Sequence, residues 1–252
     1  MHPAFRQTDH RPWPVPKRPW VMSMVWERLL FMHWPVPTDA LQQLLPDGLT
    51  IDTFDGSAWL AVVPFTMSHV RLRFTPSIPR QHAFHELNVR TYVRDATGTP
   101  GVWFFSLDAA NPIAVRTARA TFRLPYFDAR MALERDGVAT RYVSRRTHRG
   151  APPATYEATY RPTGEPTRSQ PGTIEHFVTE RYCLFNDGPR GICRGDIQHV
   201  PWPLQRAECE TRTNTMTEQL GLDLPDAEPL LHYAEHLDVV AWWPKPVGKS
   251  ER

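Results

Sequence analysis

Strict alternation of polar and apolar side chains over residues 84–93 is the feature that most constrains the fold of this chain. The two alternating sets are Glu86, Asn88, Arg90 and Tyr92, and Leu87, Val89, Thr91 and Val93. Because successive side chains of a strand point to opposite faces, the pattern predicts a β-strand with one polar face. Antiparallel sheets often turn such a face to water. Asn and Arg have specific hydrogen-bonding geometry, however, so this face is also a candidate ligand-binding surface.

Most other apolar stretches also predict strands, which makes the fold class mainly β with minor α. The expected strands cover residues 24–31, 58–64, 70–74, 102–108, 115–124, 138–145, 156–161, 177–185, 191–199, 204–211 and 231–243. A turn at 95–101 is expected to join the 84–93 strand to the 102–108 strand as a hairpin. Short helices are expected after Pro37 and over 214–220, and the Pro-rich segment 148–173 is a candidate variable loop.

The length of 252 residues is compatible with one all-β domain. We expect an extended N-terminal arm over residues 1–20, followed by a single domain over residues 21–246. A homodimer formed through an edge strand is compatible with this organisation.

Charge and cysteine usage limit the expected partners and compartment. With 29 basic and 27 acidic residues the net charge is +2, which favours neither nucleic acid nor a membrane surface. The basic stretch 145–149 is interpreted as a solvated loop. Residues 1–20 lack the apolar core of a signal peptide, so we expect a cytoplasmic protein. The three cysteines fit reduced thiols, and Cys183 and Cys193, which flank a turn, are interpreted as buried small hydrophobes.

No cofactor or metal is expected. The sequence has no Gly-rich phosphate loop, no G-x-S-x-G motif and no paired C-x-x-C motif. Residues 232–236 read H-x-x-E-H, the pattern of a zinc-binding helix. The neighbouring β-branched and aromatic residues favour a strand instead, on which His232 and His236 would lie about 13 Å apart, too far to share a metal.

An ordered series of motifs resembles the YqjF-like uncharacterised family, domain of unknown function 2071. The matching pieces are FMHWPV at 31–36, DGSAW at 55–59, VVPF at 62–65, ELNVRTYV at 86–93, GVWFFSLD at 101–108, LPY at 124–126, TERY at 179–182, HVPWPL at 199–204 and DVVAW at 238–242. This resemblance covers about residues 20–245. It implies a fold related to acetoacetate decarboxylase, namely a conical antiparallel β-barrel whose interior holds the active site.

The same resemblance argues against the decarboxylase reaction. Those enzymes form a Schiff base through a lysine that follows a proline. The amine of that lysine is activated by a neighbouring cationic group and an apolar pocket. Tyr126 stands at the similar place in this chain, and lysine occurs only at positions 17, 245 and 249. Glu86 falls where the decarboxylases keep a glutamate on the cavity wall. The resemblance therefore implies a cavity without its amine nucleophile.

These observations predict a site that binds a small ligand with a carboxylate or carbonyl group. Glu86 and Tyr126 are the candidate catalytic residues, with Glu86 as acid or base. The candidate ligand-binding residues are Arg90, Asn88, Tyr92, His33, Ser106, Asp108, Arg119 and Arg181. Ser106 and Asp108 are expected on the cavity side together with Phe104. An internal Glu86–Arg90 ion pair without chemistry is the structural alternative.

Three functions remain open from the sequence. The first is a carrier that binds an organic acid or carbonyl compound without turning it over. The second is a lyase, isomerase or hydrolase that uses Glu86 with Arg90 or Asn88. The third is an interaction scaffold with a filled barrel.

Overall fold

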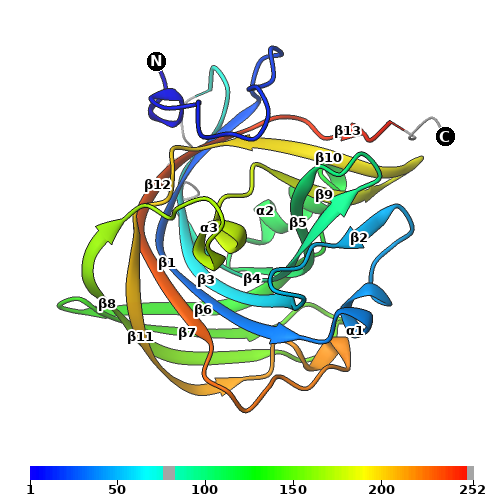
Figure 1. Cartoon of the computed structure of the whole chain (residues 1–252). Helices are drawn as coiled ribbons and strands as arrows, with labels where there is room; N and C mark the ends of the chain where they lie inside the picture. Colours follow the sequence, from blue (N-terminus) through cyan, green and yellow to red (C-terminus); the bar gives the residue numbers. More distant parts are fainter. Residues whose placement is uncertain (76–82, 249–252) are drawn as a thin grey trace.

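The architecture is mainly β, as the periodicity predicts. The computed structural model describes residues 1–75 and 83–248 (Figure 1). Its strands are β1 (Met22–Val36), β2 (Leu49–Ile51), β3 (Ala58–Leu72), β4 (Phe84–Asp95), β5 (Pro100–Ala109), β6 (Tyr126–Asp136), β7 (Ala139–Arg146), β8 (Thr155–Thr167), β9 (Cys183–Gly188), β10 (Gly191–Gln198), β11 (Leu204–Asn214), β12 (Leu230–Ala241) and β13 (Lys245–Pro246). The helices are α1 (Thr38–Gln42), α2 (Pro112–Thr121) and α3 (Ile174–Thr179), with short 3-10 turns η1 (Pro3–Phe5) and η2 (Glu218–Leu220). Within the described part of the chain, none of these helices has the length and apolar content needed to cross a bilayer.

The strands form one sheet that closes on itself twice. Because β4 pairs with β5 and β10 pairs with β12, one closed circuit runs β10-β9-β5-β4-β3-β1-β12; we call it the small ring. A second circuit, the large ring, runs β5-β6-β7-β8-β11-β12-β1-β3-β4. Most pairings are antiparallel, whereas β5 pairs in parallel with both β6 and β9. Five strands, β12, β1, β3, β4 and β5, are therefore shared, and each presents one face to each ring.

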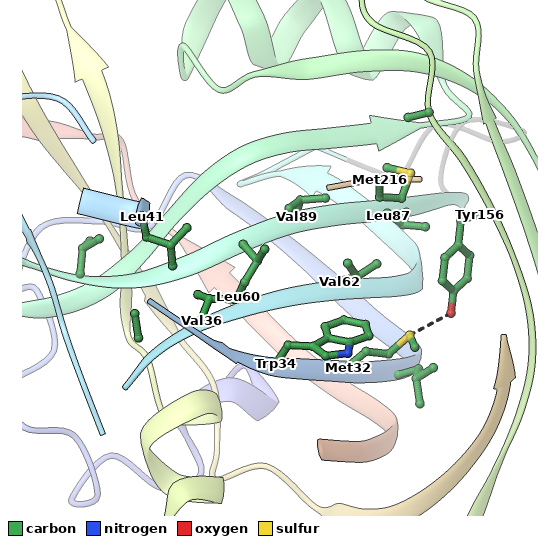
Figure 2. Close-up of a cluster of buried hydrophobic side chains, with 14 of the residues drawn as sticks. Met32, Trp34, Val36, Leu41, Leu60, Val62, Leu87, Val89, Tyr156 and Met216 are labelled. Carbon is green, nitrogen blue, oxygen red and sulfur yellow. Dashed lines mark hydrogen bonds between the residues drawn. The ribbon is translucent and has the colours of Figure 1, made fainter. Parts of the chain in front are cut away.

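The interior of the large ring is filled with side chains. Apolar residues of the shared strands, among them Met32, Val62 and Leu87, pack against buried tyrosines from β7 and β8. Figure 2 shows this packing, in which the hydroxyl of Tyr156 lies 3.2 Å from the sulfur of Met32. The Tyr142 hydroxyl also donates a hydrogen bond to the backbone oxygen of Glu86 at 2.9 Å. This half of the molecule is a close-packed core.

The segment over 115–124 is a helix, so the strand predicted there is wrong. The Asn111 side chain caps α2 by accepting from the backbone N–H groups of Ile113 and Ala114, and Pro112 occupies its first turn. The helix carries the chain across from β5 to the parallel strand β6, since parallel neighbours need such a crossover. The Asn-Pro pair is the local signal for this helix start.

Other boundaries also differ from those predicted. The sequence predicts two strands over residues 58–64 and 70–74, but β3 runs through as one. It predicts a strand over residues 177–185, but α3 occupies the first part of that segment. Half of the segment 148–173, predicted as a loop around a short strand, belongs to β8, which pairs with both β7 and β11. Arg146, expected in a solvated loop, is buried at the end of β7.

The N-terminal arm lies against the outside of the small ring, at the end of β12 (Figure 1). It contains the turn η1 rather than being extended throughout. Ala4 is fully buried against Trp242 and Val240, and the Gln198 side chain donates to the backbone oxygen of Ala4 at 2.8 Å. Cys183 and Cys193 are both buried and free, on the two strands of the β9–β10 hairpin.

Candidate functional site

A cavity of about 520 Å³ lies inside the small ring. Every strand of that ring contributes lining residues, and one side of α2 closes it through Ala114 and Ala118. Its volume falls within the range of small-molecule sites, roughly 300–1,000 Å³. The lining is mostly apolar, for example Met24, Val63 and Phe65. The structure thus places a ligand-sized space on the face of β4 that the sequence pattern marks as polar.

The polar side chains of β4 line this cavity together with Tyr126. Glu86, Asn88 and Arg90 alternate along β4 and all reach the cavity wall. Asn88 pairs with Leu107 of β5, which in turn pairs with Tyr126 of β6, so the crossover through α2 brings Tyr126 beside β4. The Tyr126 hydroxyl donates to Oε2 of Glu86 at 2.8 Å. The two candidate catalytic residues are therefore in direct contact.

Burial changes the protonation of both partners in this pair. Glu86 is only 2% exposed, and its pKa is raised from 4.5 to about 8. Desolvation is the main cause, the Tyr126 hydrogen bond opposes it, and the Asp108 carboxylate adds to it. Burial and the Glu86 carboxyl likewise raise the pKa of Tyr126 well above its usual value. Near neutral pH Glu86 is thus mostly a neutral acid, able to donate a proton or a hydrogen bond.

Asn88 and Arg90 present polar atoms that no described residue satisfies. Oδ1 of Asn88 and Nε of Arg90 are buried without a hydrogen-bond partner. Among the described residues there is no ion pair between Glu86 and Arg90, so the structural alternative of an internal pair is wrong. The Arg90 guanidinium instead lies over the rings of Phe31 and Tyr92, at 5.3 Å and 5.8 Å. Buried polar groups are nearly always paired in folded proteins, which makes these two atoms available to a ligand.

Tyr92, His33 and Arg181 lie behind Arg90 rather than on the cavity wall. The Tyr92 hydroxyl is 2.6 Å from Nε2 of His33, and both side chains are fully buried. Desolvation, helped by the nearby charge of Arg90, keeps the pKa of His33 well below 6.5. Arg181 lies 5.1 Å over the Tyr92 ring and forms an ion pair with Asp52 at 2.7 Å. These residues support the Arg90 side of the site without lining it.

Ser106 and Asp108 do not line the cavity, so their expected placement is wrong. Arg90 pairs with Phe104, but Val89 pairs with Ser106 and Leu87 with Asp108, because a bulge at Phe105 shifts the register. Phe104 therefore stays on the cavity side, while Ser106 and Asp108 turn into the large ring. There Asp108 pairs with buried Arg146 at 2.7 Å.

Arg119 is also absent from the described cavity lining. It is exposed on the last turn of α2, where its Nη1 donates to the backbone oxygen of Tyr126 at 2.7 Å. This bond fixes the start of β6 and with it the backbone of Tyr126. Arg119 thus acts on the site only through the position of another residue.

Residues that sequence reasoning missed complete the wall. Trp26 lines the cavity and has a buried Nε1 without a partner among the described residues. Arg71, Leu72 and Ile113 are exposed lining residues and mark the mouth. Trp26 is separated from Glu86 by 60 positions, and nothing in the local pattern distinguishes it from a core tryptophan. Only the closure of the small ring brings these elements together.

The H-x-x-E-H segment lies on strand β12. His232 is buried there, while the exposed His236 contacts Asp238 at 3.1 Å. In residues 1–75 and 83–248 no group of three His, Cys, Asp or Glu side chains is arranged to hold a metal ion. The described cavity lining also includes no lysine. Lys249 lies outside the described residues.

Comparison with known proteins places the chain in a family. Residues 23–238 match the model of DUF2071, described as an uncharacterized conserved protein. The protein YqjF of Bacillus subtilis (strain 168), itself uncharacterized, is 43% identical over 228 residues, which cover 90% of this chain and 93% of that protein.

Solved structures with the same fold are much more distant in sequence. The enduracididine biosynthesis enzyme MppR, complexed with the condensation product of pyruvate and imidazole 4-carboxaldehyde, superposes with a TM-score of 0.62 at 10% identity, covering 90% of this chain and 89% of that one. Acetoacetate decarboxylase from Legionella pneumophila gives 0.61 at 13% identity, covering 100% and 98%. An acetoacetate decarboxylase-like enzyme from Sphingomonas wittichii RW1 gives 0.61 at 12% identity, covering 96% and 99%. The chain therefore belongs to the uncharacterized YqjF-like family DUF2071 and has an acetoacetate decarboxylase-like fold.

Proposed function

We propose that this protein binds a small organic acid or carbonyl compound in the cavity of the small ring. The observation that carries the proposal is the convergence of Glu86, Asn88, Arg90 and Tyr126 on one buried wall of that cavity. Arg90 supplies a permanent positive charge and a planar set of donors that match a carboxylate or an enolate. A neutral Glu86 adds a further donor to a ligand oxygen.

The fold neighbours support the choice of ligand class only in general terms. MppR has been solved with pyruvate, so a protein of this fold can hold a small keto acid. A Schiff-base decarboxylation is not proposed, because Tyr126 occupies the position similar to the lysine and neither a phenol nor a guanidinium forms an iminium. The filled-barrel scaffold is disfavoured by the cavity of about 520 Å³.

Native mass spectrometry tests this proposal directly. The purified protein is weighed under native conditions beside a denatured sample, and extra mass that leaves on unfolding is identified by fragmentation. A released acid or carbonyl compound supports the proposal. If the protein is free of bound mass, thermal-shift screening with carboxylic and carbonyl metabolites follows. Failure of every such compound to bind would contradict the proposal.

A second candidate function is acid–base catalysis in the same cavity. The observation that favours it is the raised pKa of Glu86, about 8, in direct contact with Tyr126. Such tuning near neutral pH suits a proton-transferring lyase, isomerase or hydrolase. Glu86→Gln separates the two functions, since it should abolish turnover in an enzyme but change the affinity of a carrier only modestly. Glu208→Gln, at an exposed glutamate outside the cavity, is the control and should leave both turnover and affinity unchanged.

Two further predictions remain for experiment. Cytoplasmic localisation is tested by fractionating cells that express the tagged protein. A homodimer is tested by sedimentation velocity over a range of protein concentrations.

A further inference from the structure

The cavity has a polar end and an apolar end. Glu86 and Asn88, at the polar end, are 2% and 4% exposed, so this end is deeply buried. The lining residues Leu72 and Ile113, by contrast, are 53% and 55% exposed and mark the mouth. A ligand that enters by the mouth must therefore place its polar atoms inward and pass its remaining atoms along the apolar wall.

The wall between these ends is apolar on several elements. β1, β3 and α2 all contribute, through side chains such as Met24, Met67 and Ala118. Ala114 and Ala118 are one turn apart on α2, so the helix presents small side chains to the cavity. A two- or three-carbon acid would leave most of a space of about 520 Å³ unfilled and would leave this wall uncovered.

Beside Arg71, the surface around the mouth carries several exposed apolar side chains. The large hydrophobic side chains exposed among the described residues include Phe74, which is 88% exposed and directly precedes the lining residue Thr75. Trp243, 45% exposed, stacks on the lining residue Phe122 with ring centroids 4.9 Å apart. Together with Leu72 and Ile113 they extend the apolar surface from the cavity outward.

The buried polar atoms define the other end of the ligand. Asn88 is nine-tenths buried, lines the cavity and has an unpartnered Oδ1, and Nε of Arg90 is unpartnered beside it on the same strand. The Asn88 amide can present either its oxygen or its nitrogen, because an amide flip exchanges the two. Arg90, the Asn88 nitrogen and protonated Glu86 are therefore the donors that this wall offers to the carboxylate or carbonyl group of a ligand.

We propose that the natural ligand is an amphipathic acid, with its carboxylate held by Arg90, Asn88 and Glu86 and an apolar tail that runs along α2 toward the mouth. This inference rests on the proposed function and narrows it to a ligand class. Acids without a tail bind weakly because they bury little apolar surface. Affinity then rises with tail length until the tail reaches Leu72 and Ile113.

A series of unbranched monocarboxylates from acetate to decanoate tests the tail. Kd is measured at pH 6.5, where Glu86 is protonated, and at acid concentrations below those at which micelles form. Calorimetry is used for most of the acids, and ligand-observed NMR for the weakest. Burial of each added CH₂ should lower Kd about fourfold. The alkylamine of the same length is the control for the head group and should bind at least tenfold more weakly than the acid.

Variants at the two ends of the cavity test where the tail and the carboxylate of the ligand lie. Ala114→Trp fills the path of the tail, so it should remove the higher affinity of the long acids and leave the affinity of the short acids unchanged. Ala118→Leu is the milder replacement if the first variant does not fold. Ala120→Trp, on the exposed side of the same helix, is the matched control and should bind like the wild type. Arg90→Gln should weaken acids of every length by a similar factor.

The outcomes separate this inference from the proposed function. If acids bind with an affinity that does not depend on length, or if Ala114→Trp and Ala120→Trp behave alike, the tail inference is wrong while the organic-acid site stands. If no acid or carbonyl compound binds at any length, both fail. A steady rise in affinity that Ala114→Trp removes supports both.

Discussion

The two rings share five strands but use them in opposite ways. On the large-ring face, Val62 and Leu87 pack into a filled core with buried tyrosines. On the small-ring face, Val63 and Glu86 border a cavity of about 520 Å³. Five strands are common to both rings, so the difference comes from the side chains that alternate along these strands and from the elements that close each ring. These elements are β9, β10 and α2 around the cavity, and β6, β7, β8 and β11 around the core. A single sheet thus packs a core with one face and lines a cavity with the other.

The charged groups of the two rings differ in whether they have partners within the protein. In the large ring Asp108 and Arg146 are paired at 2.7 Å, and Arg146 also donates to Gln219 at 2.6 Å. In the small ring Nε of Arg90 has no partner among the described residues. The Asp108–Arg146 pair thus stabilises the fold, and under the proposed function the unpartnered N–H of Arg90 serves the ligand.

Breaking the buried pair of the large ring should have the largest effect. Asp108→Ala leaves Arg146 as an uncompensated buried charge and should lower the free energy of unfolding by about 3–5 kcal/mol. Urea denaturation measures the loss. Glu208→Ala, which breaks the exposed Arg161–Glu208 pair, is the control and should cost less than about 1 kcal/mol. Equal losses in the two variants would contradict the contrast between buried and exposed pairs.

Substitutions at two neighbouring valines of β3 compare the filled face and the hollow face of the strand directly. Val62→Phe forces a larger ring into the packed core of the large ring and should cost about 1–3 kcal/mol. Val63→Phe, one residue along, projects into the cavity and should cost clearly less, while it weakens ligand binding. Thermal unfolding and the ligand titration read out the two effects. Similar destabilisation by both variants would mean that the small ring has no usable space.

Glu86, in the small ring, should make the stability of the protein depend on pH. Its folded pKa of about 8 lies above the unfolded value of 4.5, so between these values the folded state keeps a proton that the unfolded state has lost. Stability should therefore fall as pH rises through this window, by up to roughly 1.4 kcal/mol per pH unit.

Glu86→Gln isolates this contribution, since glutamine does not titrate. The free energy of unfolding of the wild type minus that of the variant, measured by urea denaturation from pH 5 to 8, should fall as pH rises. A difference that stays constant over that range would show that Glu86 has an ordinary pKa.

The smallest effect is expected for the hydrogen bond within the site. Tyr126→Phe removes the donor to Glu86 and should cost about 1 kcal/mol, because only one buried bond is lost. It should also raise the pKa of Glu86 further, since that bond stabilises the ionised carboxylate. Titration of Glu86 followed by ¹³C NMR checks the direction, and a lowered pKa would contradict it.

The sequence alone determined the mainly β class, the polar face of β4 and the absence of a lysine at the position of Tyr126. Alternation with period two is a local property, so the order of residues along β4 is enough to assign Glu86, Asn88 and Arg90 to one face. The motif series likewise identified the family. These conclusions depend on residue types and spacings along one strand or short segment.

What lies opposite β4 depends on how distant parts of the chain pack together. The helix α2 replaced a predicted strand, and the bulge at Phe105 turned Ser106 and Asp108 away from the cavity. One inserted residue reverses the face of everything after it, and the hydrophobic pattern of the strand does not reveal it. The contact between Tyr126 and Glu86, and the hollow small ring itself, depend on pairings between distant strands, whose geometry no local pattern encodes.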